Sequence, residues 1–243
     1  MSTDTLTVLS TLGTNEALYI EAVTHLFAFA QVPTDLFVSL DEGTEAQVQS
    51  LLSRGNATVP SVSVDASPKR RGLVESYNAG FRYFLARPQY KYLHLLEEGV
   101  RVLKGWDMAL RSTLDAHPDF GWVACGQVHN PGAPFTALCS LLTREAVEKV
   151  KGLDPLFAPD QFDDGDLFMR LRDFGYWPQA VPFRVLHPRS RTSRNGTQQE
   201  DYDRMLAHQQ LFADRHGIPD MPWASVPVHP GDCAACATAV GSG

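Results

Sequence analysis

The sequence predicts a single α/β domain with a mainly parallel, doubly wound sheet flanked by helices. Short apolar, β-branched runs alternate along the chain with helical patterns, which is typical of strands connected by crossover helices. The length of 243 residues suits one large hydrophobic core. With 44% hydrophobic and 20% charged residues, the composition is that of a globular protein. In such a sheet we expect ligands at the carboxyl ends of the strands.

The first half of the chain contains four expected strands and three expected helices. Each strand is a short run rich in apolar and β-branched residues, and each helix carries apolar residues at helical spacing. The expected strands cover residues 5–11, 35–40, 59–64 and 90–96. The expected helices cover residues 15–30, the segment after Glu45 as far as Arg54, and residues 71–86, with Pro88 stopping the last one.

The second half continues the alternation beyond the Gly105-Trp106 pair. Expected strands cover residues 120–128, 139–142 and 180–187, and expected helices cover residues 143–150 and 198–216. A further helix is expected between the last two of these strands. Its apolar residues at helical spacing are Leu167, Phe168, Leu171 and Phe174, and Gly175 is placed to end it.

Three carboxylates mark the start of that helix, in the stretch Phe162-Asp163-Asp164-Gly165-Asp166-Leu167. Acidic residues are common at helix starts, because the free N–H groups and the helix dipole favour negative charge there. For Asp163 or Asp166 taken alone, stabilisation of the helix start would be a sufficient explanation. The group as a whole lies between two expected strands, the second of which ends at His187. That setting favours acid–base or metal chemistry.

Charge and hydropathy argue against several classes of partner. The formal net charge is −7, and no Lys/Arg run is longer than the three residues at 69–71, which disfavours a nucleic-acid duplex. No segment approaches the ~20 apolar residues of a membrane span. The N-terminus lacks the basic and apolar regions of a signal peptide. We therefore expect a cytoplasmic protein.

The order of motifs from Cys139 to His187 resembles the C-terminal half of a family 2 glycosyltransferase of GT-A fold. In that family a strand and a helix are followed by a Gly-hydrophobic-Asp turn, an [Glu/Asp]-Asp-x-Asp motif, an Arg before Gly-Tyr, and then Pro and His. The corresponding residues are Gly152-Leu153-Asp154, Asp163-Asp164-Gly165-Asp166, Arg170 or Arg172 before Gly175-Tyr176, Pro182 and His187. The resemblance covers about residues 5 to 216, and it implies a GT-A-like fold.

The resemblance implies nucleotide-sugar binding at three strand ends. Thr11-Leu12-Gly13 resembles the family's Thr-Tyr-Asn, with Leu12 and Gly13 departing from it. The stretch Leu40-Asp41-Glu42-Gly43-Thr44 resembles a Val-Asp-Asp-Gly-Ser stretch of the family that contacts the base and ribose, and Asp41 matches its Asp. Without the resemblance, Asp41 at a strand-to-helix turn would be expected to cap the helix. Arg71 lies in a stretch that resembles the segment which closes over the nucleotide in the family. It would either pair with phosphate or be a solvated residue at a helix start.

The fourth strand end, Leu96-Glu97-Glu98-Gly99-Val100, resembles the family's Leu-Asp-Asp-Asp-Val stretch, which binds ribose and a divalent metal ion. Gly99 stands at the last acid and supplies no ligand. The resemblance implies that Glu97 contacts the donor and that Glu97, Glu98 and His187 bind Mn²⁺ or Mg²⁺. Alternatively, Arg189 and Arg191, in a polar loop over residues 188–196 that we expect to act as a lid, would neutralise the leaving diphosphate.

The function implied is transfer of a sugar from a UDP-, GDP- or dTDP-linked donor to an acceptor hydroxyl, with inversion at the anomeric carbon. Asp164 would be the general base, with Asp163 and Asp166 positioning it or binding acceptor hydroxyls. One alternative is a catalytically weak or inactive binding module of the same fold, which Gly99 favours. A nucleotidyltransferase is a second alternative, but the first strand lacks a Gly-rich phosphate loop with a trailing Lys.

The composition changes near Gly217. We therefore expect a glycosyltransferase-like domain over residues 1–216 and a Pro-rich extension over residues 217–243. The extension contains Cys233-Ala234-Ala235-Cys236, half of a zinc site without a second cysteine pair. A free or oxidisable pair fits this pattern better than a structural zinc ion.

Overall fold

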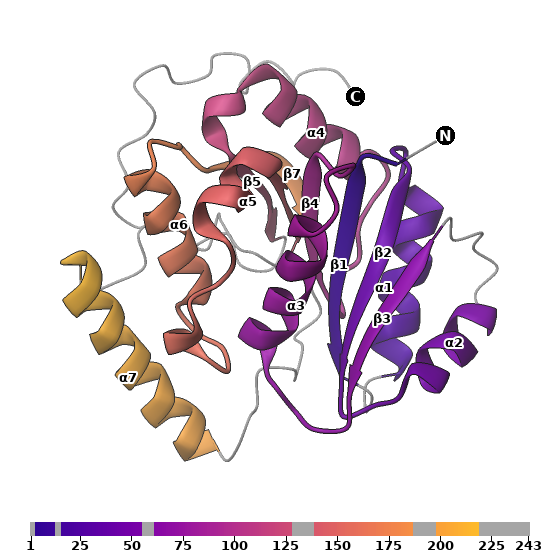
Figure 1. The fold of residues 1–243 in the computed structure, drawn as a ribbon, viewed down its shortest axis with the longest axis horizontal. Helices are drawn as coiled ribbons and strands as arrows, with labels where there is room; N and C mark the ends of the chain where they lie inside the picture. The colour runs from indigo at the N-terminus through magenta and orange to yellow at the C-terminus, as the bar shows by residue number, and fades with distance from the viewer. Residues whose placement is uncertain (1–2, 13–15, 55–60, 128–138, 187–197, 219–243) are drawn as a thin grey trace.

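The computed structural model describes residues 3–12, 16–54, 61–127, 139–186 and 198–218 (Figure 1). The strands in this part of the chain form one seven-stranded sheet with the order β3-β2-β1-β4-β6-β5-β7. The predicted α/β class is therefore confirmed. The strands are β1 (Thr5–Leu12), β2 (Thr34–Asp41), β3 (Val62–Ser67), β4 (Tyr92–Glu97), β5 (Trp122–Gln127), β6 (Cys139–Thr143) and β7 (Gln179–Val185).

Helices connect the strands at nearly every crossover, as expected for a doubly wound sheet. The helices are α1 (Glu16–Phe29), α2 (Glu45–Arg54), α3 (Leu73–Leu85), α4 (Trp106–Ala116), α5 (Arg144–Val150), α6 (Asp163–Asp173) and α7 (Gln198–His216), with single turns η1 (Pro118–Phe120) and η2 (Pro155–Phe157). No helix in the described ranges has both the length and the apolar character needed to span a bilayer.

The sheet is parallel except around β6. Strands β1 to β4 pair in parallel, and β5 pairs in parallel with β7. Strand β6 is antiparallel to both of its neighbours, β4 and β5. The predicted mainly parallel sheet is confirmed, whereas the reversed strand between its two parallel parts was not predicted.

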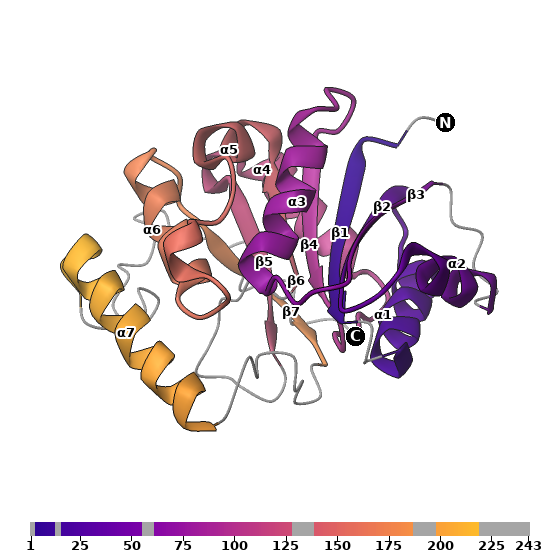
Figure 2. The same cartoon turned by 60° about the horizontal axis from the view of Figure 1, so that its bottom comes forward.

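Two hydrophobic clusters, one on each face of the sheet, form the core. On the α3 face, buried residues of α3, α5 and α6 pack on the strands (Figure 1). On the α1 face, buried residues of α1 and α4 do the same (Figure 2). Helix α7 lies beside α6, where Phe157 and Phe162 pack against Phe212. A sheet covered on both faces is typical of parallel strands with crossover helices.

Two elements differ from the prediction. Helix α4 was not expected, although its buried residues Trp106, Leu110 and Leu114 recur every fourth position; Gly105, at φ 88°, turns the chain into it. Strand β3 was predicted at residues 59–64 but begins at Val62 and reaches Ser67. Its register explains the shift, because Asp41 at the end of β2 pairs with Ser67 and so extends β3 toward the carboxyl edge.

Candidate active site

Asp41, at the end of β2, holds the segment that leads into α3. The Asp41 side chain is 2% exposed. Its Oδ2 accepts hydrogen bonds from the backbone N–H groups of Arg71 (2.7 Å) and Gly72 (2.8 Å), and its Oδ1 accepts from Arg71 Nε (2.8 Å). The cap of α2 is instead made by Thr44 and Gln47, whose side chains bond each other's backbone N–H groups. Asp41 is therefore not the cap of α2.

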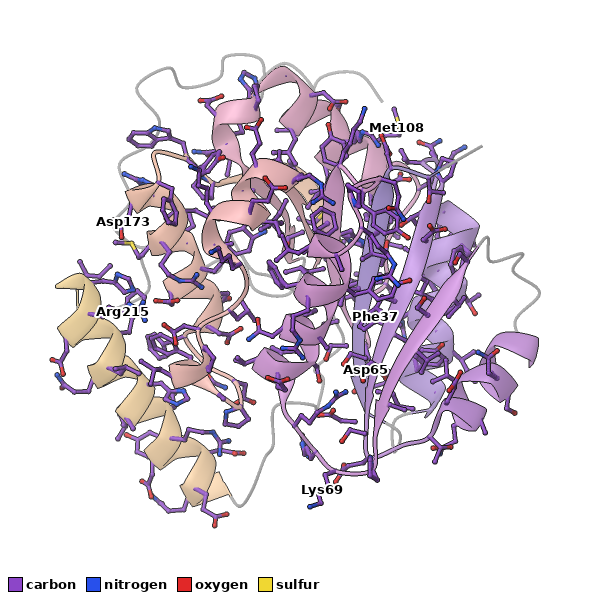
Figure 3. The ribbon with its side chains drawn as sticks, viewed as in Figure 1. Phe37, Asp65, Lys69, Met108, Asp173 and Arg215 are labelled. Atoms are coloured by element: carbon purple, nitrogen blue, oxygen red, sulfur yellow. The ribbon has the colours of Figure 1, made fainter. Side chains whose placement is uncertain are left out.

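Arg71 joins the ends of β2 and β3. Besides Asp41, its guanidinium donates to Asp65 Oδ2 (2.7 Å) and to Ser39 Oγ (3.0 Å). Figure 3 shows Asp65 on β3, in the part of the strand that leads toward Lys69 and the start of α3. The reading of Arg71 as a solvated helix-start residue is wrong, because its side chain is 20% exposed and pairs with two carboxylates. We call Asp41, Asp65 and Arg71 the arginine clamp.

The ends of β1 and β4 meet next to this clamp. Thr11 Oγ1 donates a hydrogen bond to Glu98 Oε2, and the backbone N–H of Glu98 donates to Ser10 O (3.2 Å). Glu98 is 0% exposed, so its carboxylate is enclosed within the protein. Glu97, one residue earlier, is also buried. The Leu12 side chain and Gly13, predicted to bind the donor, lie outside the described residues.

The acidic motif forms the first turn of α6, as predicted. Two non-glycine residues with positive φ, Gln161 (80°) and Phe162 (63°), lead into it. This backbone conformation is costly for a side chain, and such outliers gather at functional sites. Asp163 is buried, whereas Asp164 is partly exposed, and Asp164 Oδ1 accepts a hydrogen bond from the N–H of Gly165 (2.8 Å).

The charges of three carboxylates, Glu97, Asp160 and Asp164, act on the buried Asp163; we call these four residues the carboxylate cluster. Burial raises the pKa of Asp163 well above its ordinary value, and the charges of Asp164, Asp160 and Glu97 raise it further. Burial also raises the pKa of Asp160, against the lowering effect of Arg204. Glu97 of β4 is thus close enough to the motif of α6 for its charge to act on Asp163. Asp160 was missed, since it precedes the motif and no pattern marks it.

Asp166 is engaged by a different set of partners. It is 0% exposed; its Oδ2 accepts from Arg170 Nε (2.6 Å), while its Oδ1 lies 3.0 Å from His216 Nε2 and 3.4 Å from Arg215 Nε. Arg170 also donates to the carbonyl groups of Val150 and Gly152. Asp166 thus joins α6 to the last turn of α7, where Figure 3 shows Arg215 beside α6. This differs from the role predicted from the sequence, in which Asp166 positions Asp164 or binds acceptor hydroxyls.

The Gly152-Leu153-Asp154 turn is tied to α3 by Asn78. The Asn78 side chain accepts from Leu153 N–H (2.8 Å) and donates to Leu153 O (3.0 Å). A Cβ atom at Gly152 would lie 2.5 Å from Asn78 Oδ1, so the turn needs glycine there. These motif residues fix the position of α6 relative to α3, and with it the carboxylate cluster.

The predicted metal site is only partly described. His187, Arg189 and Arg191 lie outside the described residues. Within the described ranges, no group of three or more His, Cys, Asp or Glu side chains is arranged to hold a metal ion. Of the two predicted glutamates, Glu98 gives one oxygen to Thr11. The described residues therefore do not by themselves form a metal site.

Two solved structures with a similar fold contain a bound nucleotide sugar. A mannosyltransferase from Pyrobaculum calidifontis, in complex with GDP-Man and Mn²⁺, matches with a TM-score of 0.64 at 15% identity, covering 100% of this chain and 77% of that one. TarS from S. aureus, in complex with UDP-GlcNAc, matches with a TM-score of 0.61 at 10% identity, covering 87% and 66%. No protein-family model and no curated protein sequence matches the chain. The chain thus shares its α/β fold with a mannosyltransferase and with TarS, each solved with a nucleotide sugar bound.

Proposed function

We propose that the protein is a glycosyltransferase that moves a sugar from a nucleotide-sugar donor to an acceptor hydroxyl. The observation that carries the proposal is the carboxylate cluster beside the arginine clamp, at the carboxyl edge of a sheet whose structural neighbours bind GDP-Man and UDP-GlcNAc. Ligands of open α/β sheets bind at this edge. The family 2 assignment, hexosyl transfer and inversion of configuration belong to this proposal.

The donor nucleotide would bind at the ends of β1, β2 and β4. Asp41 is held by Arg71, so the base and ribose would meet a preformed clamp and not a mobile carboxylate. Preformed groups lower the conformational entropy lost on binding. Thr11, Glu97 and the Leu12-Gly13 segment would complete the donor site, with a UDP-, GDP- or dTDP-linked sugar as the ligand class.

Asp164 is the general base in this proposal. Among the three aspartates of the motif it is the one whose side chain is partly exposed, so it can reach an acceptor hydroxyl. It would take the hydroxyl proton while the acceptor oxygen attacks the anomeric carbon and the nucleoside diphosphate leaves on the opposite side. Asp163, beside it and buried, would position the acceptor or the base.

The leaving diphosphate needs a positive partner. A divalent ion supplies such charge when bound, and the neighbour with GDP-Man also contains Mn²⁺. In this chain Glu97, Glu98 and His187 are the proposed ligands, with Arg189 and Arg191 as the alternative source of positive charge.

A thermal-shift screen of UDP-, GDP-, dTDP- and CMP-sugars, with and without Mn²⁺, tests the proposal. A ligand at 100 times its Kd stabilises the native state by about 2.7 kcal/mol. For a chain of this size that is roughly 5–10 °C in Tm. We expect such a shift with one nucleotide class, and its loss in Arg71→Ala. A folded protein that shifts with none of the four donor classes would refute nucleotide-sugar binding.

The alternative of a binding module without turnover is supported by Gly99, which stands where the family carries an acid. The two functions differ in one observable. A binding module would give the thermal shift but no donor-dependent release of nucleoside diphosphate, whereas the proposed enzyme gives both.

A further inference from the structure

Helix α7 presents a row of side chains to α6 and to the segment that leads into α6. Arg204, His208, Phe212 and His216 recur at every fourth position, so they lie on one face of the helix. Figures 1 and 2 show α7 beside α6. Each of the four side chains contacts the acidic motif or the residues just before it. The proposed mechanism uses none of them.

His208 makes the contact that fixes the main chain before α6. Its Nδ1 lies 2.9 Å from the backbone oxygen of Asp160, and both residues are buried. A carbonyl oxygen can only accept a hydrogen bond, so Nδ1 carries the hydrogen and donates it. The ring also meets Phe157 edge-on, with the two ring centroids 5.7 Å apart. The imidazole is therefore fixed both in orientation and in tautomer.

The segment that His208 holds is anchored on its other side by α3. The backbone oxygen of Pro159 accepts a hydrogen bond from the N–H of Val74 (3.0 Å). One residue later, Asp160 is held by α7 in two ways. Its carbonyl group accepts from His208, and its Oδ1 lies 3.4 Å from Arg204 Nε in an ion pair. The main chain at this point is thus fixed between two helices.

Two residues with positive φ connect Asp160 to the acidic motif. Gln161 and Phe162 have φ angles of 80° and 63°, and we call these two residues the left-handed link. Side chains rarely adopt this conformation, so it persists only where the surrounding structure holds it. The link ends in the first turn of α6, where Phe162 O accepts from the N–H of Asp166 (2.9 Å). The position of Asp164 on that turn therefore depends on how the link is held.

We propose that His208 is a positioning residue for the general base. Its hydrogen bond to the Asp160 carbonyl group holds the left-handed link, and so sets where Asp164 meets the acceptor hydroxyl. The effect on turnover rests on the proposed function, whereas the hydrogen bond and its hold on the link do not.

His25 provides an internal comparison. It lies on α1, and its Nδ1 is 3.2 Å from the backbone oxygen of Val102, in the segment before α4. The bond is of the same kind, a partly buried imidazole donating to a carbonyl group, but it joins different elements. Removing it controls for the loss of a histidine–carbonyl bond as such.

Hydrogen exchange of residues 161–166 tests the hold on the link in the full chain. Leu and Asn have nearly the same size, but only Asn keeps an N–H donor at the same place along the side chain as Nδ1 of histidine. Losing one hydrogen bond in His208→Leu should speed exchange there about 3- to 10-fold. His208→Asn and His25→Leu should stay within about twofold of the wild type. No acceleration in His208→Leu, or equal acceleration in the Leu and Asn variants, would overturn the proposal.

A measurement on the wild type covers the case in which the His208 variants do not fold. Nitrogen NMR shifts of the neutral His208 ring show which ring nitrogen carries the hydrogen. We expect the hydrogen on Nδ1, because a bond to a carbonyl group requires a donor there. A hydrogen on Nε2 alone would reject the bond.

The positioning role is tested by the kinetics of nucleoside diphosphate release. We expect His208→Leu to lower kcat about 10- to 100-fold, because a small displacement of a catalytic group has an effect of that size. The KM for donor should stay within about threefold, since the arginine clamp is untouched. His208→Asn should recover most of the lost kcat, and His25→Leu should keep both parameters.

An unchanged kcat in His208→Leu, or equal losses of kcat in the Leu and Asn variants, would refute the positioning role. If the wild type turns over no nucleotide sugar, the proposed function fails. Hydrogen exchange and the ring tautomer then still decide whether His208 holds the link.

Discussion

Replacing Asp166 by alanine tests whether this residue acts in the fold or in catalysis. The carboxylate is fully buried between Arg170 on its own helix and Arg215 and His216 at the end of α7. Removing it takes the ion pair from the Arg170 guanidinium and removes the contacts of Arg215 and His216 with α6, although Arg215 keeps its ion pair with Asp154. Breaking a buried pair from one side costs about 3–5 kcal/mol.

The structure places the loss for Asp166→Ala near the lower end of that range. Arg170 keeps two hydrogen bonds to backbone carbonyl groups, and its side chain is 16% exposed, so its charge is not stranded. A loss of about 3 kcal/mol corresponds to roughly 6–12 °C in Tm for a chain of this size.

Thermal unfolding of Asp166→Ala beside Glu75→Ala measures this. Glu75 pairs with Arg82 on the surface, where both side chains are largely exposed, so its loss should cost at most about 1 kcal/mol. A variant at Asp166 that melts like the control but has lost turnover would refute the structural role and return Asp166 to the catalytic group.

Three further predictions concern the cluster and the metal. Asp164→Asn keeps the oxygen that accepts from Gly165 N–H, so it should fold and bind donor normally while nucleoside diphosphate release falls by ~10²-fold or more; turnover within a few-fold of wild type would remove Asp164 as the base. Because burial raises the pKa of Asp163 above 3.8, the native state holds that proton more tightly than the unfolded state, and the free energy of unfolding contributed by this group falls as the pH rises above that value. Asp163→Asn should therefore melt higher than wild type at neutral pH, with the gain shrinking as the pH falls toward 3.8; a gain that is the same at every pH would contradict this. Mn²⁺ should bind weakly alone and more tightly with nucleoside diphosphate in calorimetric titrations, and His187→Ala should lose that coupling; equal donor turnover in EDTA would exclude the ion.

The order of strands and helices was predictable because it depends on local patterns. The apolar runs of β1, β2 and β4 and the helical spacing of α5 and α7 lie within a few residues in the sequence, and their predicted bounds agree closely with the structure. The direction of β6 was not predictable in this way. A four-residue apolar run reads alike in both directions, and pairing with β4, such as Leu96 opposite Cys139, sets the orientation.

In the candidate site, too, residues in short motifs could be predicted, whereas contacts that depend on tertiary packing could not. Asp163, Asp164 and Glu97 could be proposed from the sequence because they stand in short motifs, and in the structure the charges of Asp164 and Glu97 act on Asp163. The partners of Asp166 could not be found, because His216 lies 50 residues downstream and its contact depends on the packing of α7 against α6. The ion pair of Arg71 with Asp65 could not be predicted either, because it depends on the register of β3 against β2, which no motif encodes.

The central claim is that the carboxylate cluster and the arginine clamp form a glycosyl-transfer site. Its most direct test is donor-dependent release of nucleoside diphosphate, measured for wild type and Asp164→Asn with the donor class that gives the thermal shift. We predict release by the wild type, accelerated by an acceptor with free hydroxyls, and a loss of ~10²-fold or more in the variant. A donor that binds tightly but is released intact by both proteins, under every acceptor and metal condition, would contradict the claim and leave a binding module.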